Sequence, residues 1–314
     1  MIDVLAFGLL MNLSTSDSIN LRERLSISLW RDTWLKFKRD RTAVLGTIIL
    51  TVIVLAVIFG PIIYPIPIDK IDFSQSAAPP SWQHWFGTND LGQDQLARVL
   101  QGGRISLTVG ITAMIVAIFW GTLIGAIAGF YGGIIDGILM RIADLFLALP
   151  HLPLLLLIVY LFRDSIKKIA GPEFGIFLLV VLVIGGLNWM SVARLVRANI
   201  LTLKEMEFVS AAQAIGAKPS RLIWIHLLPN VLGIIIVAAT LSVGNAIITE
   251  STLSFLGLGF PPDVPTWGRM LYDAQNYLTS APHIAIFPGL AIFLTVLSIN
   301  YLGDGLRDAF DPKT

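Results

Sequence analysis

Long apolar stretches, separated by short polar segments, dominate the sequence. A helix needs about 20 mostly apolar residues to cross the roughly 30 Å hydrocarbon core of a bilayer. Six stretches without Asp, Glu, Lys or Arg reach or approach this length, and they are residues 43–68, 105–135, 145–162, 174–193, 222–249 and 274–303. The pattern therefore predicts an all-α integral membrane protein with six transmembrane helices.

The third stretch, residues 145–162, is the shortest of the six. A transmembrane helix in this region could begin earlier, at Asp136. Because a charge at membrane depth is costly, we would then expect Asp136, Arg141 and Asp144 to lie near the interface or to face protein.

Composition narrows the class of protein further. Charged residues make up 14% of the 314 residues, against roughly 25% in soluble globular domains, and the mean hydropathy is +0.77. These values exclude a soluble enzyme, a disordered protein and a nucleic-acid-binding module as first interpretations, and a net charge of +1 gives no field that would attract a polyanion. The chain has no Cys, which excludes disulfides, thiolate metal sites and cysteine nucleophiles.

The distribution of Lys and Arg predicts the orientation in the membrane, because cytoplasmic loops carry an excess of these residues. With a cytoplasmic N-terminus, fifteen of the 22 basic residues fall in inner segments and seven in outer segments. We therefore expect both termini in the cytoplasm. Arg163, Lys167 and Lys168, three cations on the predicted outer side, fit this orientation least well.

The N-terminal region carries two separate signals. Residues 1–12 are apolar but lack a basic segment and a clear cleavage site, so we do not interpret them as a signal peptide, and Met11 is an alternative start of the chain. Residues 21–41 combine basic residues with Trp30 and Trp34. They predict either an amphipathic helix on the inner leaflet or an ordinary cytoplasmic cap.

Several familiar catalytic motifs are missing from the sequence. It contains no G-x-x-x-x-G-K-[ST] phosphate-binding loop, no H-E-x-x-H motif and no G-x-S-x-G motif. None of the four His pairs with another at ligand spacing. We therefore expect a chain that is not an enzyme and does not hydrolyse ATP by itself.

Residues 207–217, between the fourth and fifth predicted spans, have the pattern of a short amphipathic helix. Glu207 suits the positive end of the helix dipole. Ala211 and Ala212 are small and follow one turn later, and Gly216 stands where a helix-ending glycine is expected. Small residues let another protein approach closely, which indicates a docking element; the alternative is a surface helix that only connects two spans.

The spacing E-x-x-x-A-A-x-x-x-G of residues 207–216, followed by Arg221 and by H-L-L-P-N, resembles the coupling-loop signature of permease subunits of ABC importers. Four further motifs resemble the C-type subunit of the oligopeptide/dipeptide (peptide/nickel) permease subfamily. They are residues 87–94 with 103–107, 250–259, 261–268 and 300–308. The resemblance runs from about residue 29 to residue 312, and five motifs in the right order make it specific.

The resemblance implies a fold, a function and partners. The fold is that of a type I ABC importer permease, with six transmembrane helices and a cytoplasmic coupling helix. The chain would form half of a translocation pathway for di- or oligopeptides, beside a homologous second permease, two ABC ATPase subunits and an extracytoplasmic solute-binding protein. It would be a multi-pass protein of the cell (inner) membrane, with the lipid bilayer around it and no nucleic acid partner. This chain would hold no cofactor, because ATP and Mg are bound by the partner subunits.

The resemblance also assigns roles to residues of the coupling loop. Glu207, Ala211, Ala212 and Gly216 would couple the chain to an ATPase subunit as mechanical parts.

Two polar residues in or near the fifth span, Glu250 and Asn245, each allow two interpretations from their position in the sequence. Glu250 lines the pathway or a gate, or it is an interfacial carboxylate that caps helix ends or pairs with a cation. Asn245 lines the pathway or, as we favour, bonds across helices.

Small residues and a proline within the spans predict how helices pack. Gly121, Gly125 and Gly129 have the spacing for close helix packing, either inside the chain or against a partner permease. Pro229, early in the fifth span, predicts a tolerated kink rather than a hinge.

The first outer loop departs from the subfamily pattern. Asn89, Gln93 and Ala97 stand where the subfamily usually has Asp, Arg and Ser. The departures concern how this loop meets the binding protein or closes the outer gate, and they leave the implied docking to the ATPase unaffected.

We expect the chain to divide into a cytoplasmic N-terminal segment with an amphipathic helix, a first span, an extracytoplasmic loop, a permease core with five spans and a coupling loop, and a cytoplasmic tail. The bounds are 1–42, 43–68, 69–104, 105–303 (coupling loop 204–221) and 304–314. An ABC permease for a nickel chelate or an oligosaccharide remains an alternative function. An ion-coupled secondary transporter fits less well, because it would need acidic residues at mid-span, which the spans nearly lack.

Overall fold

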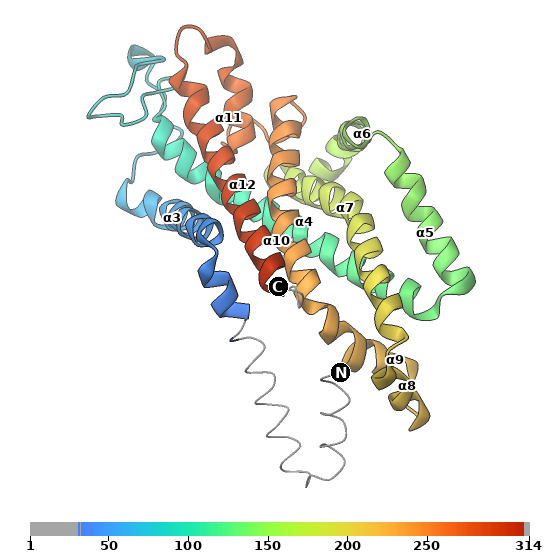
Figure 1. Ribbon diagram of the computed structural model, residues 1–314. Helices are drawn as coiled ribbons and strands as arrows, with labels where there is room; N and C mark the ends of the chain where they lie inside the picture. The colour runs from blue at the N-terminus through green and yellow to red at the C-terminus, as the bar shows by residue number, and fades with distance from the viewer. Residues whose placement is uncertain (1–30, 32, 311–314) are drawn as a thin grey trace.

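The computed structural model describes residue 31 and residues 33–310, and this part of the chain is mostly helical (Figure 1). The predictions for residues 1–12, for Met11 and for most of the 21–41 segment lie outside the described residues. The helices are α3 (Arg41–Ile63), α4 (Gln95–Tyr131), α5 (Gly133–Ala148), α6 (His151–Ala170), α7 (Pro172–Lys204), α8 (Glu207–Ala214), α9 (Pro219–Arg221), a π-helix (Leu222–Leu227), α10 (Leu228–Phe255), α11 (Trp267–Ala274) and α12 (His283–Phe310), with short 3₁₀ turns at Phe73–Gln75 and Gln275–Tyr277.

Five helices are long and apolar enough to cross a membrane. They are α3, α4, α7, α12 and the continuous run Pro219–Phe255, which joins α9, the π-helix and α10. α5 and α6 meet the same criteria only as a pair, and they are bent by 90° at the break between them. The described part of the chain thus contains five spans, or six if this pair counts as one, and the predicted all-α membrane fold is confirmed.

The predicted third span over residues 145–162 is broken into two helices. α5 ends at Ala148, Leu149 has an extended backbone with a ψ of 142°, and α6 begins at His151. Pro150 is the physical reason. Its ring disfavours the helical conformation of the residue before it, and it has no N–H to donate into a helix.

Two of the three charged residues predicted for this region, Asp136 and Asp144, form ion pairs with α7. Asp136 pairs with Arg197 and Asp144 pairs with Arg194, both on α7. Arg141 is exposed. The two ion pairs hold α5 against the C-terminal half of α7. α6 packs on the N-terminal half of α7.

The two ends of the bundle are different in character (Figure 1). α8 and α9 lie together at one end, which we call the coupling end. α11 and the loop 64–94 lie at the opposite end, which we call the outer end. α4, α7, α10 and α12 run between the two, so that a motion at one end can reach the other through rigid helices.

The closest helix pair is α4 with α7, and glycines make it so. A Cβ atom at Gly121 would lie 2.5 Å from the Cβ of Val192, and one at Gly125 would lie 2.5 Å from the carbonyl oxygen of Ala193. A Cβ at Gly129 would lie 2.9 Å from another carbonyl oxygen of α7. The predicted close packing is confirmed, and it is made inside the chain.

Replacing Gly125 by Ala should therefore destabilise the helix bundle. The added methyl group meets backbone, which cannot rotate away, and overpacking of this kind costs about 1–3 kcal/mol. Gly137→Ala is the matched control, because nothing lies within 4 Å of a Cβ at this helical glycine. Thermal unfolding of the isolated chain in detergent should show a lower midpoint for G125A only, and equal midpoints would contradict the packing.

Candidate coupling site and outer polar network

The predicted amphipathic helix of the coupling segment exists as α8, and its ends follow from the sequence. Met206 is extended and precedes the helix, and Glu207 lies in the first turn. Gly216 has a φ of +84°, which favours glycine. Its N–H bonds to the carbonyl of Gln213, and the next N–H bonds back to the carbonyl of Ala212, so the last carbonyls of α8 are satisfied in a Schellman motif.

One face of α8 is buried in the chain itself. Val209 is fully buried and Ala212 is 6% exposed. Both belong to an apolar cluster that includes Ile200 of α7 and Leu222 and Ile223 of the π-helix. The predicted coupling residue Ala212 therefore anchors α8 to the bundle and does not face outward.

The opposite face of α8 is exposed and carries Glu207 and two alanines. At 100° per residue, Glu207, Ala211 and Ala214 lie across the helix from Val209, and all three are exposed. Two large apolar side chains lie along one side of this exposed face. They are Phe208, which is 37% exposed, and Ile215, which is 87% exposed. We call the exposed face with its flank the docking face.

Two features of this site were not anticipated from the sequence. In the sequence Ala211 and Ala212 form one pair of small residues, but the helix turns them 100° apart, one outward and one inward. The i, i+3 spacing of Val209 and Ala212 is the signal that marks the buried side. The exposure of Phe208 could not be deduced, since an apolar residue on a short helix normally suggests the inner face.

α8 is attached to the membrane helices through a second, polar contact. The Nζ of Lys204, at the end of α7, donates to the carbonyl oxygen of Phe130 at 2.8 Å and lies 5.8 Å from the centre of its ring. A cation suits this carbonyl, because it belongs to the unpaired C-terminal turn of α4. The α7–α8 connection is thereby fixed to α4.

The chain after α8 continues without a break into the membrane. α9, the π-helix and α10 form one helical run of 37 residues. Pro229 explains the π-helix before it, since proline lacks an N–H and its ring pushes against the carbonyl four residues earlier. The N–H of Leu228 reaches back five residues to Ile223, and the Nδ2 of Asn230 donates to the carbonyl of His226 at 2.6 Å. The proline is tolerated, as predicted.

At the outer end of this run, Glu250 is completely buried. Its Oε1 accepts a hydrogen bond from Ser254 at 2.7 Å, and its Oε2 accepts a longer one from Ser106 of α4 at 3.4 Å. The Oγ of Ser106 accepts the backbone N–H of Trp267, the first residue of α11, at 3.2 Å. Glu250 therefore joins α10, α4 and α11, and in this chain it is not exposed to solvent.

The two predicted pathway residues thus lie in opposite environments. Asn245 is exposed on α10, one turn and a half before the buried Glu250, and Ile248 is exposed on the same face. Within the described residues the Asn245 side chain makes no hydrogen bond to another helix. The favoured prediction of a bond across helices inside this chain is therefore not met.

The outer loop is tied to the start of α4 by Asp94. Its Oδ1 accepts the N–H of Ala97 and caps α4, while its Oδ2 accepts the hydroxyl of Tyr64 at 2.8 Å and lies 2.7 Å from Nδ1 of His84. Burial and the neighbouring carboxylate raise the pKa of the Tyr64 phenol well above its usual range. The phenol stays protonated and remains a donor.

Two of the three departures, Asn89 and Gln93, are partners of one another. The Nδ2 of Asn89 donates to the Oε1 of Gln93 at 2.8 Å, and both side chains are buried. The Oδ1 of Asn89 also accepts the N–H groups of Leu91 and Gln93. An uncharged amide pair thus stands at the two positions where the resembled subfamily usually has Asp and Arg.

Comparison with known proteins now decides the family. Residues 121–314 match the family described as the binding-protein-dependent transport system inner membrane component. Residues 28–80 match the N-terminal TM domain of oligopeptide transport permease C. The chain belongs to the binding-protein-dependent permease family. It is a permease subunit of an ATP-binding-cassette importer, a membrane protein whose partner subunits supply the ATPase activity.

Relatives are similar to the permease over nearly its whole length. It is 41% identical over 288 residues to the dipeptide transport system permease protein DppC of Alkalihalophilus pseudofirmus, covering 92% of this chain and 91% of that protein. It is 41% identical over 289 residues to the oligopeptide transport system permease protein OppC of Bacillus subtilis, with the same shares. It is 37% identical over 294 residues to the glutathione transport system permease protein GsiD of Pectobacterium atrosepticum, covering 93% and 94%. The resemblance to C-type subunits is confirmed.

Among solved structures, the permease is similar to a chain of the MetNI methionine ABC transporter in an inward facing conformation. The match covers 65% of this chain and 94% of that chain, with 20% sequence identity and a TM-score of 0.47.

Replacing Glu250 by Leu should loosen α11 at the outer end. The hydroxyls of Ser106 and Ser254 lose their acceptor, and an unsatisfied buried polar group costs about 1–3 kcal/mol. Glu250→Gln is the matched control, because its amide oxygen still accepts from Ser254. Amide hydrogen exchange of Trp267–Ala274 should speed up clearly in E250L and little in E250Q; unchanged exchange in E250L would show that Glu250 does not hold α11.

Proposed function

We propose that the permease forms half of the translocation pathway of a peptide importer, carrying di- or oligopeptides. The observation that carries this proposal is the 41% identity to permeases named for dipeptide and oligopeptide transport, over more than nine-tenths of the chain. A relative named for glutathione transport extends the same cargo class. A nickel chelate or an oligosaccharide is the competing cargo, and transport assays separate them.

We propose four partner chains for this permease. A homologous second permease completes the pathway, two ABC ATPase subunits bind ATP and Mg, and an extracytoplasmic solute-binding protein delivers the peptide. The family's dependence on a binding protein supports the last of these. The docking face of α8 supports an ATPase partner, because Ile215 and Phe208 are exposed beside small residues in a way that a covering protein surface would remove from water.

The proposed mechanism uses α8 as a handle. An ATPase subunit grips the docking face at Glu207, Ala211 and Gly216. Ala212 lies on the buried side and transmits the motion to the bundle through the apolar cluster. α10 then carries it to the outer end, where Glu250 positions α11. The exposed Asn245 faces the pathway or the partner permease along the way.

The proposed orientation has α8 and both termini in the cytoplasm. The outer cations that fitted this orientation least well have local reasons to be there. Arg163 donates to the carbonyl oxygens of Gly257 and Gly259 at 3.4 and 3.3 Å. Lys167 and Lys168 lie in the last turn of α6, where cations are favoured by the helix dipole. These contacts support an outer position for the end of α6.

Replacing Ala211 by Trp should block the docking face and leave the bundle intact. The side chain is exposed across the helix from the buried Val209, so a large residue there meets the ATPase and nothing in this chain. Gln213→Trp is the matched control, since Gln213 is exposed on the same helix but lies close to its buried side.

In A211W we expect membrane insertion and thermal stability of the permease to stay unchanged. Co-purification of the ATPase and uptake should both fall by about tenfold or more, the effect of losing about 1.4 kcal/mol of binding. Q213W should retain both. Normal uptake in A211W would contradict the coupling role.

The cargo is tested by uptake into vesicles that contain the assembled importer and its binding protein. Uptake of a labelled dipeptide or pentapeptide should depend on ATP and persist without a proton gradient. Saturation by a nickel chelate or an oligosaccharide, with no peptide uptake, would assign the competing cargo. Uptake that follows a proton gradient and ignores ATP would contradict the importer itself.

A further inference from the structure

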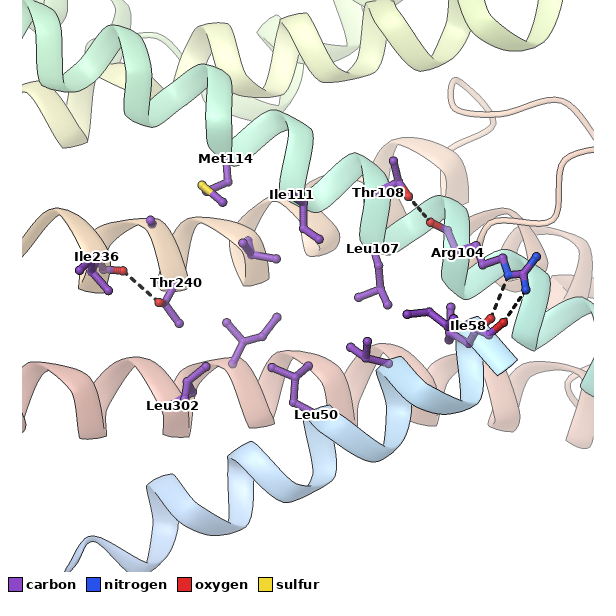
Figure 2. A pocket seen from close by; sticks show the side chains of 15 residues that line it. Leu50, Ile58, Arg104, Leu107, Thr108, Ile111, Met114, Ile236, Thr240 and Leu302 are labelled. Atoms are coloured by element: carbon purple, nitrogen blue, oxygen red, sulfur yellow. Dashed lines mark hydrogen bonds between the residues drawn. The ribbon is translucent and has the colours of Figure 1, made fainter. Parts of the chain in front are cut away.

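A large apolar groove lies in the membrane-spanning part of the chain, between α3, α4, α10 and α12 (Figure 2). Its volume is about 520 Å³, within the range of ligand sites. Leu107, Ile111 and Met114 of α4 point into it, and Leu50 of α3 and Leu302 of α12 lie on the far side. Among the described residues that line the groove, Arg104 is the one charged residue, and none of them is Asp or Glu.

Arg104 is held in place at one end of the groove by the backbone of α3. Its Nε donates to the carbonyl oxygen of Val57 at 2.9 Å, and its Nη2 donates to that of Ile58 at 2.6 Å (Figure 2). Pro61 makes the first bond necessary, because it lacks the N–H that would normally bond to the carbonyl of Val57. The guanidinium is thereby fixed along one edge.

The other edge of the guanidinium remains available. Within the described residues, Nη1 of Arg104 makes no hydrogen bond, and the residue is partly exposed. An arginine in a membrane protein normally has its donors satisfied or reaches to the polar interface. A fixed cation with two free N–H groups and no acidic neighbour in the groove favours the binding of an anion. The planar guanidinium group matches the geometry of a phosphate well.

The depth of Arg104 matches the position of lipid phosphates. Its partner Ile58 lies seventeen residues after Arg41, which is about 26 Å along α3 at 1.5 Å per residue. This length approaches the thickness of the hydrocarbon core, about 30 Å, and we therefore infer that Arg104 lies near its boundary at the outer end. From there to Met114 the groove follows α4 inward for ten residues, about 15 Å.

We propose that this groove binds one phospholipid of the leaflet at the outer end, with its phosphate on Nη1 of Arg104 and an acyl chain along Leu107, Ile111 and Met114. A phospholipid combines an anionic group at the interface with a long apolar tail below it. A peptide cargo would need a partner for its ammonium group, and the groove has no carboxylate to offer. The lipid would fill the space between α3 and the core and hold α3 in its place.

The test uses the permease purified with its co-assembling subunits, in nanodiscs that contain phosphatidylglycerol with a photoreactive group at the end of one acyl chain. After irradiation, mass spectrometry should find the label at the inner end of the groove, on α4 around Met114 and on α3 around Leu50, because the acyl chain ends there. Ile111→Trp fills the groove and should reduce this label about tenfold. Ile115→Trp is the matched control, because Ile115 is 54% exposed on the same helix but does not line the groove, and it should keep the label.

A second comparison tests the phosphate contact. Arg104→Gln should lower labelling by the phospholipid about tenfold but leave labelling by a photoreactive diacylglycerol, which has no phosphate, unchanged. Equal loss of both labels in R104Q would overturn the headgroup assignment. Full labelling in I111W, or label found at the groove only on a partner subunit, would overturn the site.

Discussion

Val209 and Ala212 bury one side of α8 against the ends of α7 and the π-helix, while the other side is left without a cover in this chain. An eight-residue helix has too few hydrogen bonds to be stable alone, so its shape and its position depend on that burial. A protein that binds the exposed side of α8 therefore moves the buried side and the residues packed on it. This apolar attachment is what makes a surface helix usable as a handle.

The attachment matters because the next element is a single long helical run. From Pro219 to Phe255 the chain passes from the coupling end to the outer end with one local widening at the π-helix. Its outer end is fixed by Glu250 to Ser106 and, through that hydroxyl, to Trp267. α8 and α11 are thus connected through one helical run and two side-chain contacts, a continuous path of the kind that can carry coupling between distant sites.

Much of this fold follows from the sequence, for reasons that individual residues make clear. The spans are visible because uncharged apolar stretches must reach about 20 residues. Gly216 marks the end of α8 because its φ is positive, and Gly121, Gly125 and Gly129 mark the closest helix contact because only glycine admits it.

Other features depend on neighbours that the local sequence does not reveal. The bend at Pro150 lies inside an uncharged stretch, so hydropathy alone joined two helices into one. Glu250 looked interfacial, but Ser106 lies 144 residues away in sequence, and only the packing of α4 on α10 brings the hydroxyl to the carboxylate. The pairing of Asn89 with Gln93 likewise depends on the folded shape of the loop, which the local sequence does not reveal.

The central claim is that an ATPase subunit holds the docking face of α8, and site-directed crosslinking measures this directly. The chain has no Cys, so a single cysteine at Ala211 is unique in it, and one at Ser81 in the exposed outer loop serves as the control. In the assembled importer, a short bifunctional crosslinker should join Ala211→Cys, but not Ser81→Cys, to the ATPase, with a yield that changes when ATP is added. A cysteine at Ala211 that never reaches the ATPase in an importer active in uptake would contradict the account.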